Sequence, residues 1–141
     1  MKREISSSAN GRVNLLGEHL DYNGGAVLPL QIDKCVKIYL SDNNTNEKIV
    51  IKSKQYDEKI IINHNLAKQE NWSDFVIGAC KIISDKFGIK ISSINFVIDS
   101  DLPIGIGLSS SAAITVATLR ALITKYNIEI SNEELVGLAL R

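Results

Sequence analysis

Four polar side chains of complementary chemistry lie close together near the start of the chain, in the stretch GRVNLLGEHLDYNGG (residues 11–25). Arg12 and His19 can supply hydrogen-bond donors. The carboxylates of Glu18 and Asp21 supply acceptors. Because each hydroxyl of a sugar requires both a donor and an acceptor, this set is suited to holding a small polyhydroxylated molecule.

The same stretch also has a simpler interpretation, as a surface hairpin whose charges face water. Asn-Gly is a strong turn signal, so a turn is expected at residues 23–25 in either case. Arg12 and Asn14 alternate with apolar residues and therefore share one face of a short strand. A metal site at Glu18 and His19 is disfavoured, because adjacent residues in a chain seldom point at one ion.

A second stretch, LPIGIGLSSSAA (residues 102–113), is typical of a strand-to-helix turn that binds phosphate. Pro103 ends the strand, and Gly105 and Gly107 permit backbone angles that other residues avoid. The serines at 109–111 lie where the next helix begins, so free N–H groups and the positive helix end face one spot. The stretch lacks the lysine of a P-loop and the spacing of G-x-G-x-x-G. An ordinary turn with an N-cap stays the alternative.

Alternation and turn residues predict the strands that carry these stretches. Apolar residues at every second position predict a strand over residues 34–41, and the run DNNTN then breaks it. Two further strands are expected in residues 47–53 and 58–64, so the first half is mostly antiparallel sheet. A β-branched and aromatic segment at 92–100 predicts another strand, which runs into the second stretch.

Helical periodicity predicts three helices in the second half of the chain. The first starts at Ser73, a candidate N-cap, and ends at Gly88. The second covers residues 112–126 and is apolar on nearly every face, as expected under a sheet. The third begins at a capping box made by Ser131 and Glu134. Strands first, then helices interleaved with one strand, indicate an α+β fold.

Composition limits the class of partner. Sixteen basic and sixteen acidic residues give zero formal charge, so we expect no nucleic acid and no anionic membrane as partner. No run approaches the roughly 18 apolar residues that span a bilayer. Cys35 and Cys80 lie in apolar segments without metal-ligand spacing, which predicts buried free thiols in a reducing compartment. The chain of 141 residues suits one domain, and we expect it in the cytoplasm.

The two stretches together resemble a known family. GRVNLLGEHLDYNGGAVLP closely resembles the galactokinase signature, and LPIGIGLSSSAA resembles the phosphate-binding motif of the wider GHMP kinase superfamily. The W-x-x-F step at Trp72 and Phe75 resembles a W-x-x-Y step of galactokinases. One departure is Asn10, where the family commonly has proline. The resemblance implies the GHMP kinase N-terminal fold (ribosomal protein S5 domain 2-like), a mixed, mostly antiparallel sheet with helices packed on one face.

The resemblance also implies a reaction, the ATP-dependent phosphorylation of the anomeric hydroxyl of galactose. Arg12 would sit beside the reacting oxygen and the transferred phosphoryl group, and Ser110 or a neighbour would approach Mg²⁺. The sugar hydroxyls would be held by Glu18, His19 and Asp21. The residues expected around ATP are Trp72, Phe75, Pro103, Gly105, Gly107, Leu108, Ser109, Ser110, Ser111 and Ala112.

Galactokinases take a catalytic aspartate and a C-terminal domain from later segments. Residues 1–141 are therefore expected to be the N-terminal sugar- and ATP-binding domain, truncated before both, inactive alone and prone to self-association through its bared apolar face. Two alternatives stay open: a non-catalytic galactose and ATP sensor, and another GHMP kinase of a different small molecule. The intact serine run favours catalysis over sensing. Glu18, His19 and Asp21 argue against a kinase of a different sugar or of a mevalonate-type alcohol.

Overall fold

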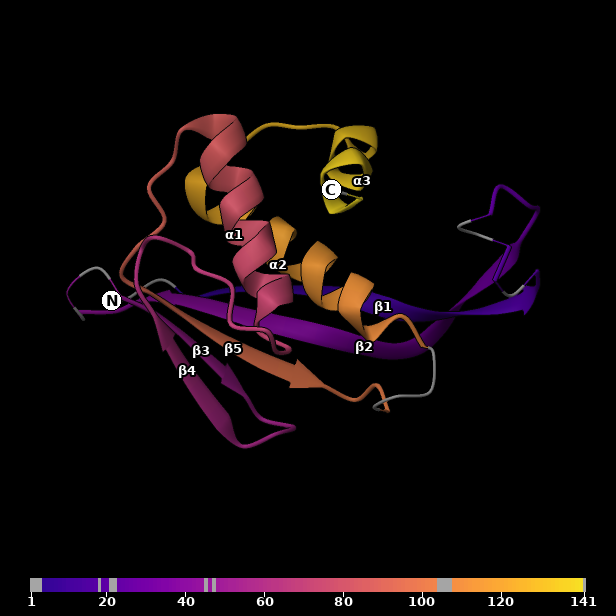
Figure 1. Ribbon diagram of the computed structural model, residues 1–141, viewed down its shortest axis with the longest axis horizontal. Coiled ribbons are helices and arrows are strands. Elements are labelled where there is room, and N and C mark those ends of the chain that lie inside the picture. The colour runs from indigo at the N-terminus through magenta and orange to yellow at the C-terminus, as the bar shows by residue number, and fades with distance from the viewer. Residues whose placement is uncertain are drawn as a thin grey trace.

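The computed structural model describes residues 4–17, 19–20, 23–44, 46, 48–103 and 108–140. Within them the helices lie together on one face of a sheet (Figure 1). The elements in chain order are β1 (Ile5–Leu16), β2 (Leu28–Asp42), β3 (Ile49–Ser53), β4 (Glu58–Ile62), α1 (Asp74–Phe87), β5 (Ile94–Ser100), α2 (Ser110–Tyr126) and α3 (Asn132–Ala139). The predicted α+β arrangement, with helices on one face, is confirmed.

The described strands form one five-stranded sheet in the order β1-β2-β5-β3-β4. Strand β5 is inserted between β2 and β3, antiparallel to β2 and parallel to β3. The other neighbouring pairs are antiparallel. The sheet is therefore mixed and mostly antiparallel, as predicted, and the insertion of β5 brings its carboxyl end close to the turn between β3 and β4.

Strands β1 and β2 are longer than the sequence indicated. The prediction placed a short strand around Arg12 and Asn14, and a second strand over residues 34–41. In the structure the serines before Arg12 already belong to β1, and β2 begins at Leu28. The polar opening forms a strand because its alternate residues face α2: Ala9 is buried, and the hydroxyl of Ser7 donates to the Ala117 carbonyl.

The core lies between the sheet and helices α1 and α2. Val36, Ile38 and Leu40 of β2 are fully buried, as the alternation predicted. Cys80 is also fully buried and free. Cys35 is only partly buried, so the prediction that both thiols are core residues is wrong for Cys35: its neighbour Val36 takes the inward position on the strand.

The ends of α1 and α2 match the prediction only in part. Gly88 has φ 66° and its N–H donates to the Ser84 carbonyl, as a C-terminal glycine should. Ser73 does precede α1, but its side chain does not cap the helix; its hydroxyl donates to Asn71 Oδ1 instead. Helix α2 begins at Ser110, two residues before the predicted start, so two of the three serines belong to its first turn.

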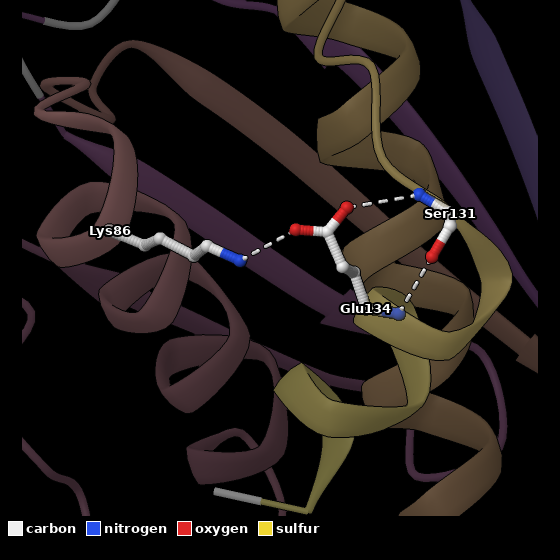
Figure 2. Close-up of polar contacts among 3 residues, drawn as sticks. All are labelled: Lys86, Ser131 and Glu134. Atoms are coloured by element: carbon white, nitrogen blue, oxygen red, sulfur yellow. Dashed lines mark hydrogen bonds and ion pairs between the residues drawn. The ribbon is translucent and has the colours of Figure 1, made fainter.

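Helix α3 begins with the predicted capping box. The Ser131 hydroxyl accepts from the Glu134 N–H at 3.2 Å, and the Glu134 carboxylate accepts from the Ser131 N–H. Figure 2 shows the second oxygen of that carboxylate directed at Lys86 of α1, with 3.5 Å between the charged atoms. The box therefore also joins α3 to α1. Among the described residues, none of the helices combines the length and the apolar character that crossing a membrane requires.

Candidate functional site

Strand β1 touches the loop that leads into α2, and this contact joins the two stretches singled out in the sequence. The N–H of Arg12 donates to the carbonyl of Leu108 at 3.3 Å. Gly11 permits the approach: a Cβ there would lie 2.9 Å from that carbonyl oxygen and 2.5 Å from Leu102 Cδ2. The residue before Arg12 must therefore be glycine for strand and serine turn to meet.

A groove of about 540 Å³, which we call the β1–α2 groove, lies at this contact. It brings together Arg12, Ser109 and Ala112, three of the candidate residues named from the sequence. Arg120 of α2 also lines it and donates from Nη1 to the Ser8 carbonyl at 2.9 Å. The lining residues are Ala9, Asn10, Gly11, Arg12, Pro29, Gln31, Ser109, Ala112, Ala113, Val116 and Arg120. With two guanidinium groups and no carboxylate among these residues, the groove favours an anion.

The start of α2 contributes Ser109, Ala112 and Ala113 to this groove. Ser109 occupies the N-cap position in the left-handed region (φ 58°), and within the described residues its side chain makes no capping hydrogen bond. Its carbonyl accepts from the Ala113 N–H, which begins the helical ladder. The first turn carries no acidic residue. The amides of residues 110–112 thus keep the donor character that helix N-termini offer to phosphate groups.

A second, smaller cavity of about 80 Å³ lies beside the start of α2; we call it the aromatic pocket. Trp72 and Phe75 line it together with Ser110 and Ser111, so the aromatic step and the serine run share one cavity. The other residues that line the aromatic pocket are Ser53, Gln55, Tyr56, Ile98, Ser100, Leu102 and Ile114. An aromatic wall next to the start of a helix has the chemistry that suits a nucleotide base.

The sequence did not indicate Tyr56 or Glu58 as members of this site. The Tyr56 ring stacks on Trp72 with 5.8 Å between centroids and 17° between planes. The Trp72 Nε1–H donates to Glu58 Oε2 at 2.7 Å. Both residues come from the β3–β4 hairpin, which reaches α2 only because β3 pairs with β5. Arg120 was missed as well, although it is the one charged residue among the apolar and hydroxyl side chains of residues 110–124.

The predicted sugar-binding residues are described only in part. Glu18, Asp21, Gly105 and Gly107 lie outside the described residues. His19 is exposed in the turn after β1, with φ 65°, and its carbonyl accepts from Asn23 Nδ2 at 2.8 Å.

The remaining predicted residues lie near the serine turn. Leu108 is partly buried and Pro103 is exposed.

On β1, the Oδ1 atom of Asn14 is buried and has no hydrogen-bond partner among the described residues. Such an atom is costly unless a donor reaches it. Asn14 shares a strand face with Arg12, so this acceptor lies on the side of β1 that the sequence assigned to the sugar.

Metal-binding groups are sparse in the parts of the chain that the structure describes. No three His, Cys, Asp or Glu side chains gather there closely enough to hold an ion. The hydroxyls of residues 109–111 are the oxygen groups nearest the helix end. Magnesium is commonly held by one or two protein groups together with substrate phosphates, so a serine hydroxyl fits a minor share of such a site.

Two family models match the chain. "GHMP kinases N terminal domain" matches residues 74–141, which hold α1, β5, α2 and α3. "Galactokinase galactose-binding signature" matches residues 2–41, which hold β1 and most of β2. The two matched regions are the ones that meet at the contact between Arg12 and Leu108.

Curated relatives and solved structures agree with these models. The chain is 38% identical to galactokinase of Thermosipho africanus over 93% of its length, and 38% identical to galactokinase of Pyrococcus furiosus over 90%. It spans 36% and 35% of those proteins, about a third of their length. Lactococcus lactis galactokinase in complex with galactose superposes with a TM-score of 0.83 at 27% identity, covering 97% of this chain and 36% of that one. Mevalonate kinase of Methanococcus jannaschii superposes with a TM-score of 0.82 at 26% identity, and the match covers 99% of this chain and 45% of that one.

Proposed function

We propose that this chain belongs to the GHMP kinase family and that residues 1–141 are the sugar- and ATP-binding domain of a galactokinase. The matches to the GHMP kinase N-terminal domain and to the galactokinase galactose-binding signature support both parts of the proposal. The proposed reaction transfers the terminal phosphoryl group of ATP to the anomeric hydroxyl of galactose and yields galactose 1-phosphate. Because the chain spans 36% of a typical relative, we assign ligand binding to these residues and turnover to a protein of the relatives' length.

The observation that carries the proposal is the contact between β1 and the serine turn. It sets Arg12 and the first turn of α2 at the same groove, one from each of the two matched regions. In the proposed complex the amides of residues 110–112 bind the phosphates. The Arg12 guanidinium then stabilises the charge on the oxygens of the moving phosphoryl group, which is where phosphoryl transfer gains most from a fixed cation.

The sugar would lie beyond Arg12, toward the turn that follows β1. Glu18, His19 and Asp21 are proposed to hold its hydroxyls, and the buried Asn14 Oδ1 is an acceptor that a hydroxyl could satisfy. This arrangement would direct the anomeric oxygen at the terminal phosphorus, since positioning of the two reactants supplies much of the acceleration in such reactions.

The nucleotide base would lie at the aromatic pocket, against Trp72 and Phe75. Its phosphates would follow the turn that contains Gly105, Gly107 and the serines. Mg²⁺ is part of the proposal: when bound, it would neutralise phosphate charge, with the Ser110 hydroxyl as the protein ligand. A reducing, cytoplasmic location is likewise proposed, on the strength of the buried free thiol of Cys80.

Ligand-dependent stabilisation of the 141-residue chain tests the proposed function. A ligand at 100 times its Kd should raise the free energy of unfolding by about 2.7 kcal/mol, visible as a higher unfolding temperature. We expect this rise with ATP and with galactose, and none with mevalonate at equal concentration. We also expect no galactose-dependent release of ADP from this chain alone.

The outcomes separate the candidate functions. Stabilisation by mevalonate but not by galactose would contradict the galactokinase assignment and favour another GHMP kinase. If a chain of the relatives' full length binds galactose and ATP without releasing ADP, the sensor alternative replaces the enzyme. Absence of stabilisation by ATP would overturn the proposed function altogether.

A further inference from the structure

We propose that Glu58 is a positioning residue that orients the Trp72 indole in the aromatic pocket, and that it thereby gives the site its preference for a nucleobase over bare polyphosphate. The inference rests on the proposed function, because it assumes that the aromatic pocket takes the base of ATP. It goes beyond that function by assigning a role to a residue of β4 that lies outside both matched regions.

The contact between the two side chains is short and charge-assisted. The Trp72 Nε1–H lies 2.7 Å from Glu58 Oε2, within the range of hydrogen bonds to an ionised acceptor. An indole has one donor, so the position of its acceptor fixes the direction in which the ring edge points. Glu58 opens β4 and Trp72 lies in the loop before α1, so the bond ties a sheet edge to the aromatic step.

The other ring of the stack is held independently. Tyr56 lies in the β3–β4 turn, whose backbone is bonded to β5 by the Lys54 N–H at the Ile98 carbonyl, 3.0 Å. Gln55 Nε2 donates to the Leu102 carbonyl at 3.0 Å. The Lys54 ammonium donates to Asp99 Oδ2 at 2.7 Å, and this bond raises the pKa of Lys54. The turn thus fixes Tyr56 from the β5 side, and Glu58 fixes the ring that stacks on it.

The orientation of the indole bears on base binding because the aromatic pocket is small. Trp72 is one of the walls of a space of about 80 Å³, so the plane of its ring helps to set the shape of the space beside Ser110. A base gains stacking energy only against a ring that already has the right plane, since ordering a loose ring costs entropy. Polyphosphate alone, bound at the start of α2, does not use the indole.

The experiment compares ATP with inorganic tripolyphosphate. Trp72 is the one tryptophan in the sequence, so its fluorescence reports directly on this pocket. Titrations measure Kd for both ligands in the wild-type chain, in Glu58→Ala, in Glu58→Gln and in Glu129→Ala, a matched control at an exposed glutamate. Tripolyphosphate binding is followed by calorimetry, because it need not change the emission.

We expect Glu58→Ala to weaken the affinity for ATP about five-fold, which is within the range of one lost hydrogen bond. The Kd for tripolyphosphate should change by less than two-fold. Glu58→Gln should restore most of the ATP affinity, since its amide oxygen can accept from the indole. In the ligand-free protein, acrylamide should quench Trp72 more strongly in Glu58→Ala than in Glu58→Gln.

A merely structural role for Glu58 predicts a different result, in which the affinities for ATP and for tripolyphosphate fall by the same factor. That result, or an unchanged ATP affinity in Glu58→Ala, overturns the inference and leaves the proposed function intact. If the wild-type chain binds tripolyphosphate but not ATP, or neither ligand, the proposed function fails and the nucleobase role of Glu58 fails with it.

Discussion

At the scale of single residues, the two arginines of the β1–α2 groove have different tasks. Arg120 donates to the Ser8 carbonyl and so helps to hold α2 against β1. Arg12 lies on the strand that contacts the serine turn, and it lines the groove from β1. We propose that Arg12 binds the ligand and that Arg120 has a structural role.

Substitution of Arg12 should affect ATP more than ADP. In the proposed complex the guanidinium faces the terminal phosphate, which ADP lacks. We expect Arg12→Ala to lower the affinity for ATP about ten-fold, because hydrogen bonds between charged groups are lost. The affinity for ADP should fall by less than two-fold. Arg12→Lys should be intermediate, because an ammonium keeps the charge but not the forked geometry. Calorimetric titration of both nucleotides measures the difference.

Lys37→Ala is the control for general charge effects in this experiment, because Lys37 is exposed on β2 and lines no cavity described above. It should leave both affinities unchanged. Equal weakening of ATP and ADP by Arg12→Ala would contradict contact with the terminal phosphate and would place the guanidinium nearer the inner phosphates.

Residues of the site could be predicted where a local pattern marked them. Arg12 and the serines stand out because charge beside glycine, and serine at a helix start, have a chemical meaning within a few residues. Tyr56, Glu58 and Arg120 were missed because their role depends on partners far away in the chain. Arg120 and Ser8 are 112 positions apart, and only the folded sheet brings them together.

At the scale of elements, the packing of β1 against the loop before α2 depends on Gly11. Any side chain there would press on Leu102 Cδ2 and on the Leu108 carbonyl. Gly78 offers the opposite case, because it lies inside α1 and a Cβ there would meet nothing within 4 Å. The same chemical change should therefore have opposite signs at the two positions.

We expect Gly11→Ala to lower the free energy of unfolding by about 1–3 kcal/mol, the usual cost of overpacking. The substitution should also lower the affinity for ATP, because the serine turn must shift to make room for the Cβ. Gly78→Ala should raise the free energy of unfolding by about 0.5–1 kcal/mol through helix propensity. Urea denaturation measures both, and a neutral Gly11→Ala would show that the close approach of β1 to Leu108 is not needed for stability.

Helices and strands could be predicted where residues close in sequence set their boundaries. The prediction was poorer where the extent of an element depends on pairing with another strand. Gly88 and the capping box of Ser131 and Glu134 set helix boundaries through their own hydrogen bonds. The extent of β1 could not be read from its serines, because a polar strand forms only when a partner strand and a covering helix are present. Likewise, no residue of β3 marks it as the parallel neighbour of β5.

At the scale of the whole molecule, the sheet connects the two stretches that are proposed to bind ligands. Strand β2 pairs with β1 on one side and β5 on the other, and this arrangement brings Arg12, within β1, to the loop that follows β5. The far end of the β1–β2 pair leaves apolar side chains exposed, including Leu16 and Leu28, which face each other across the strands. The predicted self-association through such a surface stays a prediction.

The stability of the whole fold should fall in alkaline solution because of Cys80. Burial raises the pKa of this thiol above its ordinary value of 9.0. Burial also raises the pKa of the nearby Tyr126 to about 12, with smaller contributions from Cys80 and Asp42. A raised pKa in the folded state means that the full stability is present below pH 9 and is lost as pH rises beyond it, because the unfolded chain can release the proton.

The effect can be isolated with Cys80→Ala. At pH 10.5 the free energy of unfolding of the wild-type chain should have fallen by about 2 kcal/mol through this thiol. The figure follows from about 1.36 kcal/mol for each pH unit above the ordinary pKa. The variant should be less stable at pH 7.5, since it leaves a small cavity, but should decline less steeply up to pH 10.5. Urea midpoints under reducing conditions measure both curves. Tyr126 and the lysines titrate in both proteins, so parallel curves would mean that Cys80 is solvated in solution, and the tight packing of α1 over the sheet would then be wrong.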